Sequence, residues 1–398
     1  MSATIGLGEK ATTGPTPQAV AAEPTARRNA GLDALRAALT LLVLFHHTAL
    51  TYGAIGGWYY REVPTDGRLE TKGLIFFCTV NQAFFMGLFF LIAGYFTPAS
   101  YEKNGAWAYL RERALRLGVP LLVFGFVIGP ATIALAQTAE GRPFVATLLG
   151  LWRRGWFENG PLWFAQALLI FTLGYLAWRA LAARWRPAGA SAAPRPFPSN
   201  AALAAAALAT GAAAFALRLV WPVGMQVLGL QLAYFASYVV LFAAGCAGAS
   251  AHWLVDAPAG QRRLWRIVAR LTLLVLPAVV LLAPHIPALQ GDTSGGWNIQ
   301  AVVYAFWEPF VAWGIIFALL HAFERRFATL GPTWSALARR AYAIYIIHPP
   351  VLVAIALVWR DVEAPHLVKF AITGTATCLA CFWLAGLLLR APWIRRIV

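Results

Sequence analysis

Arg36 and His47 are the residues whose types and spacing first suggest chemistry, because both lie in the apolar stretch 31–52. That stretch is long enough to cross a bilayer, which takes about 20 residues. Residues eleven positions apart on an α-helix lie about 20° apart around the axis and about 16 Å apart along it. Asp33 falls on nearly the same side, whereas His46 points about 100° away from His47, and we assign it no catalytic role.

Ionisable groups at membrane depth are costly, which makes them candidates for function. Asp33 and Arg36 could equally be anchors at the membrane interface. His47 lies deeper, where a histidine needs polar partners that lipid does not offer. We expect other polar residues to converge with it on one buried cavity: Asn81, Gln166, Glu308 and His348, with Gln82 beside Asn81 in the outer half of the same span. The alternative is a network of hydrogen bonds that only joins helices.

Arg113 and Arg116 are spaced three apart, so on an α-helix they share a face, and Arg111 stands just before them. Guanidinium groups pair bidentately with phosphoryl oxygens, so this face suits a phosphate-bearing ligand. Basic residues also flank the cytoplasmic ends of membrane spans in general, which is the simpler explanation of the pair.

The composition predicts an all-α polytopic membrane protein and excludes a soluble domain. Of 398 residues, 60% are hydrophobic and 12% charged, and the mean hydropathy is +0.64. The apolar runs predict a bundle of about ten transmembrane helices, at about 32–52, 74–98, 115–137, 161–182, 201–222, 228–251, 267–287, 299–321, 336–358 and 367–390.

The formal charge of +16 predicts topology rather than nucleic-acid binding. With ten spans, 23 of the 32 lysines and arginines fall on the side of the termini, so both termini are expected in the cytoplasm, with residues 53–73 and 138–160 facing outward. Residues 1–30 are expected to form a disordered cytoplasmic tail and residues 31–398 one transmembrane domain. The four cysteines lie in apolar spans, and we expect neither a metal site nor a disulfide.

Five separated stretches resemble the membrane-bound acyltransferase 3 family, over roughly residue 29 to the C-terminus. They are LDALRAALTLLVLFHH with Arg36 and His47, FFLIAGYF at 89–96, RERALRLGVP at 111–120, GPLWF at 160–164 and AYAIYIIHPPV at 341–351. Ala93 and Pro161 stand where the family usually has Ser and His. Within the family, the layout is similar to the glucan biosynthesis protein C branch, which succinylates periplasmic glucans.

The resemblance implies an enzyme of the bacterial inner membrane that moves an acetyl or succinyl group from cytoplasmic acyl-CoA to a hydroxyl of an extracytoplasmic carbohydrate or glycan. It implies no permanently bound cofactor. Arg36, with Asp33 beside it, and the arginines at 111, 113 and 116 would hold the CoA phosphates, and His47 would act as general base. Glu308 or His348 would orient it, and the acceptor would contact Asn81, Trp163 and Tyr345. The rival class is a proton-coupled transporter or flippase, because intramembrane His and Glu also form proton relays.

Overall fold

The computed structural model describes residues 29–185, 195–255 and 257–397, and this part of the chain consists of helices and turns without a named strand. Within it, eight helical stretches are long and apolar enough to cross a membrane. Many of their large apolar side chains point outward, as expected for helices that face lipid. The all-α polytopic fold expected from composition is therefore confirmed. The tail expected at residues 1–30 falls almost entirely outside the described residues.

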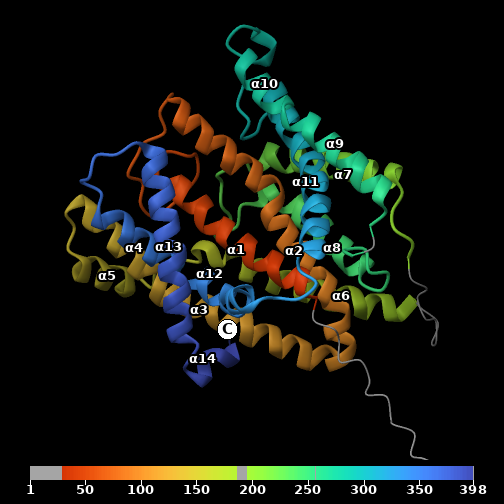
Figure 1. Cartoon of the computed structure of the whole chain (residues 1–398), viewed down its shortest axis with the longest axis horizontal. Coiled ribbons are helices and arrows are strands. Elements are labelled where there is room, and N and C mark those ends of the chain that lie inside the picture. The colour runs from red at the N-terminus through yellow and green to blue at the C-terminus, as the bar shows by residue number, and fades with distance from the viewer. Residues whose placement is uncertain (1–28, 186–194, 256, 398) are drawn as a thin grey trace, which may run out of the picture.

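Helix α1 lies in the middle of the bundle, where the other long helices surround it (Figure 1). Three of its four neighbours are distant in the sequence. It spans Ala30–Thr51 and packs against α2 (Leu69–Arg113), α11 (Ile299–Arg326), α12 (Pro332–Val358) and α13 (His366–Leu388). Asn29 caps the helix, because its side chain accepts a hydrogen bond from the Leu32 N–H. Most polar side chains of α1 beyond its first two turns are thus placed inside protein rather than in lipid.

The remaining helices cover this centre. They are α3 (Val119–Val123), α4 (Gly129–Gln137), α5 (Phe144–Arg153), α6 (Trp163–Trp185), α7 (Asn200–Val220), α8 (Phe235–Gly248), α9 (Ala259–Leu273), α10 (Val275–Leu282) and α14 (Pro392–Ile397). Helices α9 and α10 together occupy the position of the seventh expected span, and α10 projects at one end of the molecule (Figure 1).

The second expected span, 74–98, continues as helix well beyond its predicted end. Pro98 lies inside α2, and the helix runs on to Arg113 with a break at Gly105, where φ is 75°. Glycine tolerates this left-handed conformation because it has no Cβ. The helical trace then continues to Glu140, through α3, α4 and two π-helical turns at 114–118 and 124–128. The connection expected at 138–160 contains a short helix, α5, with Val145 65% exposed.

Helices α2 and α8 cross with their backbones almost in contact. A Cβ built on Gly94 would lie 2.2 Å from the Phe242 carbonyl oxygen, and one on Gly245 would lie 2.2 Å from the Leu91 carbonyl oxygen. Small residues permit such close crossings in membrane bundles, where dispersion contacts between helices carry much of the stability. Gly94 belongs to the stretch 89–96 that resembled the family, so the glycine of that stretch has a packing role.

Candidate active site

The side chains of His47 and His348 meet between α1 and α12. The Nδ1 atom of His47 lies 2.8 Å from the Nε2 atom of His348, and the two rings are almost parallel, with their centroids 5.0 Å apart. His348 is fully buried, and His47 is partly buried. Two of the residues singled out in the sequence are thus joined directly, although 301 positions separate them.

The sequence around His348 sets the direction of this hydrogen bond. In α12 the N–H of residue 349 would bond the carbonyl of Tyr345, but residue 349 is a proline and has no N–H. The His348 Nδ1 atom lies 2.7 Å from that carbonyl oxygen and takes the missing donor's place. Because a carbonyl oxygen only accepts, His348 carries its proton on Nδ1. In the neutral ring, Nε2 is then the acceptor.

His47 must therefore donate from Nδ1, and its own Nε2 carries the lone pair of the neutral ring. This is the arrangement of a general base with a second group that orients it. When His47 takes up a proton on Nε2, the Nδ1–H bond to His348 persists and stabilises the imidazolium. His46 turns away and stacks on Phe85, with ring centroids 4.9 Å apart, as the helix geometry predicts.

Trp58, in the loop between α1 and α2, covers one face of the base. Its ring lies parallel to that of His47, with centroids 4.2 Å apart, and also stacks on His348 at 5.9 Å. Sequence reasoning missed this residue. A loop aromatic has no periodicity to mark it, and only the folding of the loop back over α1 brings it to the histidines.

Glu308 belongs to a second polar cluster. It forms an ion pair with Arg218 of α7, and both side chains are almost completely buried. The Arg218 guanidinium carbon also lies 4.7 Å from the ring centroid of Tyr304 and 5.3 Å from that of Tyr234. Of the two candidates for orienting His47, the structure therefore places His348 against it and gives Glu308 another partner. Arg218 lies in the expected span 201–222, where a charge calls for an opposite charge, but its spacing does not identify Glu308 as the partner.

The other polar residues expected at membrane depth lie apart from the histidine pair, and two of them have partners of their own. Gln82 donates to the Tyr238 hydroxyl at 3.0 Å, and Gln166 accepts from Asn159 at 2.9 Å. The Nδ2 atom of Asn81 is buried and has no hydrogen-bond partner among the described residues. The Gln82 contact joins α2 to α8, which is the function that polar groups commonly serve in membrane bundles.

The arginines of the 111–116 stretch lie where α2 passes into a π-helical turn. Arg113 lies over the ring of the buried Tyr109, 5.3 Å from its centroid, whereas Arg116 is exposed and pairs with Glu112 at 3.6 Å. Tyr342 of α12 donates to the Arg116 carbonyl at 3.0 Å and ties this turn to the helix of His348. π-Helical turns are frequent at functional sites.

At the start of α1, Arg36 pairs with Asp33 at 3.9 Å, and its side chain is half-exposed. Arg111 is exposed as well. Charged groups at these positions keep access to solvent or to lipid headgroups, as the entry to a site for an anionic ligand requires.

Trp163 and Tyr345 are held by protein contacts. Trp163 stacks on Tyr238, with centroids 5.6 Å apart, and the buried Tyr345 donates its hydroxyl hydrogen to the Pro161 carbonyl. Both belong to the apolar core that surrounds α2. Their contact with an acceptor stays a prediction.

A helical membrane protein with a hydrogen-bonded histidine pair inside the bundle and arginines at one end of it has the features of an integral-membrane enzyme. A family model described as an acyltransferase domain matches residues 29–388, and the chain belongs to this family, acyltransferase 3. The protein is therefore an acyltransferase. No curated protein and no solved structure matches the chain.

Proposed function

We propose that the protein transfers an acyl group of the acetyl or succinyl class from cytoplasmic acyl-CoA to a hydroxyl of an extracytoplasmic carbohydrate. The observation that carries the proposal is the chain of hydrogen bonds from His47 through His348 to the Tyr345 carbonyl. It leaves a lone pair on His47 Nε2, which is what a general base for a hydroxyl needs.

The chemistry balances with these groups alone. The acceptor hydroxyl gives its proton to His47 Nε2 as its oxygen attacks the thioester carbonyl. The new C–O bond forms, the C–S bond breaks, and the proton passes from His47 to the departing thiolate, which leaves as free CoA. His348 keeps His47 oriented through both transfers.

The positions of the arginines support a cytoplasmic side for the acyl-CoA donor and an outward side for the acceptor. Arg36 lies about 16 Å along α1 from His47, so a donor held there by its phosphates would have to extend an arm into the bundle. The flexible arm of CoA carries its thioester at the end, away from the phosphates. With both termini in the cytoplasm of a bacterial inner membrane, the arginines face the CoA pool and the loop with Trp58 faces outward.

The test uses the purified full-length protein in lipid nanodiscs, with acetyl-CoA and succinyl-CoA as donors and a cell-envelope glycan extract as acceptor. Release of free CoA thiol and mass spectrometry of the glycans report transfer. His47→Ala is expected to lower the rate by about 10²–10⁴-fold, the usual contribution of a general base. His46→Ala is the matched control and should retain activity per folded protein. Equal losses in the two variants, or a fully active His47→Ala, would refute the proposal.

A further inference from the structure

A pocket of about 670 Å³ is lined in part by Trp58, the residue that stacks on both histidines. It is lined by the loop residues 58–62, by residues 133–140 at the end of α4, and by Arg360 and Asp361 after α12. Trp58 both lines this pocket and stacks on His47, so the pocket and the base share one residue. The volume is within the range of sites for small molecules, about 300–1,000 Å³.

The pocket lies at the end of the bundle opposite to Arg116. The helical trace from Arg116 to Gln137 covers 21 residues, or about 30 Å, which is the thickness of the apolar part of a bilayer. A ligand of this pocket would therefore approach His47 from the side opposite to the arginines of the 111–116 stretch.

The basic side chains of the lining already have partners. Arg61 donates to the Ala54 carbonyl at 2.7 Å and to the Thr65 hydroxyl at 3.0 Å. Arg360 pairs with Asp361 at 3.4 Å. An anionic ligand would have to break such pairs, so the charge arrangement favours a neutral ligand.

Two buried polar atoms of the lining lack hydrogen-bond partners among the described residues: the Nε1 donor of Trp58 and the Oε2 acceptor of Glu62. Unsatisfied buried groups are rare, and a bound ligand is one way in which they become satisfied. One donor and one acceptor at the same pocket suit hydroxyl groups, which both accept and donate. Trp58, Tyr59 and Tyr60 add the aromatic rings on which the apolar faces of sugar rings pack.

Tyr59 is itself held in place and stays neutral. Its hydroxyl donates to Glu158 at 3.5 Å. Burial, and then the Glu158 carboxylate, raise the pKa of Tyr59 well above its usual value. The phenol therefore remains a donor and adds no negative charge to the pocket wall.

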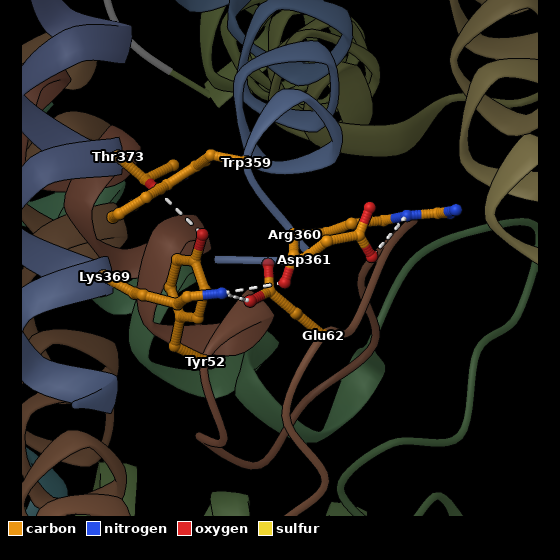
Figure 2. Close-up of polar contacts among 7 residues, drawn as sticks. All are labelled: Tyr52, Glu62, Trp359, Arg360, Asp361, Lys369 and Thr373. Atoms are coloured by element: carbon orange, nitrogen blue, oxygen red, sulfur yellow. Dashed lines mark hydrogen bonds and ion pairs between the residues drawn. The ribbon is translucent and has the colours of Figure 1, made fainter. Parts of the chain in front are cut away.

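The loop that carries these residues is fastened to α13. Figure 2 shows Lys369 reaching from α13 to Glu62, with which it forms a buried ion pair. The Lys369 Nζ atom also donates to the Arg360 carbonyl at 3.0 Å, so one ammonium group holds two walls of the pocket. Lys369 engages Glu62 through Oε1, and Oε2 is buried without a hydrogen-bond partner among the described residues.

We propose that this pocket binds the acceptor as a neutral saccharide, with a sugar hydroxyl between Trp58 Nε1 and Glu62 Oε2. The inference rests on the proposed acyl transfer for the role of the sugar, but the binding site is defined without it. Trp58 then has two tasks: it covers His47, and it fixes the bound sugar next to the base.

The experiment measures binding rather than transfer. Ala139→Cys places a thiol in the pocket wall, and Ile55→Cys, in the same loop region but outside the lining and 65% exposed, is the matched control. Full-length protein in nanodiscs is labelled with a charged maleimide, with and without millimolar maltose, cellobiose or glucose 6-phosphate. A neutral disaccharide is expected to slow labelling of Ala139→Cys at least threefold and to leave Ile55→Cys unchanged. Glucose 6-phosphate is expected to protect less.

Trp58→Phe keeps the ring over His47 and removes the N–H. It is expected to weaken protection by about 2- to 10-fold, the worth of one neutral hydrogen bond. Failure of every neutral disaccharide to protect, equal protection at both cysteines, or stronger protection by the phosphate would overturn the inference. If a neutral disaccharide protects Ala139→Cys from labelling but the protein transfers no acyl group, the saccharide site is supported and the proposed function is refuted.

Discussion

Arg218 of α7 and Glu308 of α11 form an ion pair that is closed off from solvent, with side-chain exposures of 0% and 4%. Removing one member leaves the other charge buried and unpaired, which commonly costs about 3–5 kcal/mol. Arg218→Met is therefore expected to destabilise the protein by that amount, measured as thermal unfolding in detergent. Arg218→Met combined with Glu308→Gln should recover much of the loss. A double variant as unstable as the single one would mean that the arginine stabilises through packing, not charge.

The sequence predicted the elements of the fold better than their ends. Apolar runs identify helices that must satisfy their own backbone in lipid, and eight such stretches are present in the described part of the chain. The sixth expected span, 228–251, contains only the shorter α-helix α8. The continuation of α2 to Arg113 was missed because an apolar run marks the membrane-embedded part of a helix and not its extension into water. The two π-helical turns have no sequence signal known to us.

The sequence predicted some residues of the candidate site but not their contacts, and the reason is physical. His47 and His348 are detectable because an imidazole in an apolar span is unusual. That they touch depends on the packing of α1 against α12, which sequence spacing cannot supply. Glu308 was grouped with them by depth alone, and its pairing with Arg218 depends on which helices are adjacent.

Lys369→Met tests the fastening of the pocket loop. It leaves the Glu62 carboxylate buried without its cation, so we expect a lower unfolding temperature and a higher KM for the acceptor, with the KM for acyl-CoA unchanged. Both quantities are measured in nanodiscs. Lys72→Met, which removes an exposed lysine near the same loop, is the control and should change neither. A rise in the KM for acyl-CoA alone would contradict the role of this pair.

Gly94→Ala tests the close crossing of α2 and α8. The added Cβ would meet a backbone oxygen that cannot move independently, and we expect a loss of about 1–3 kcal/mol. Gly73→Ala lies in the same helix with nothing within 4 Å of its Cβ, so helix propensity should make it neutral or stabilising. Thermal unfolding compares the two. Similar changes in both would show that the crossing tolerates a methyl group.

Arg113→Ala and Arg116→Ala test the donor end. Each is expected to raise the KM for acyl-CoA by about 10- to 100-fold, because a charge-assisted hydrogen bond to phosphate is worth about 1.5–3 kcal/mol. The KM for the acceptor should stay constant. Arg153→Ala removes an exposed arginine of α5 and serves as control. If the variants keep wild-type affinity for acyl-CoA but insert less well into the membrane, these arginines serve only to set the topology.

Pro349→Ala tests how the tautomer of His348 is set. The new N–H at position 349 would compete for the Tyr345 carbonyl, so His348 would no longer be confined to carrying its proton on Nδ1. His348 could then present N–H from Nε2, and His47 would lose its preferred orientation. We expect a rate loss of about 10- to 100-fold, smaller than that of His47→Ala. Folded protein should not decrease, because alanine suits a helix interior better than proline.

Pro350→Ala is the matched control for this change. It also restores an N–H to α12, but the carbonyl that it would meet belongs to Ile346, which is not the partner of His348 Nδ1. Both variants straighten the same part of the helix, so a loss caused by helix geometry should appear in both. A selective loss in Pro349→Ala, measured as acylated product per folded protein, would tie the activity to the proton position on His348. Equal rates in the two variants would show that Pro349 does not set the proton position on His348. The direction of the His47–His348 hydrogen bond would then need another explanation.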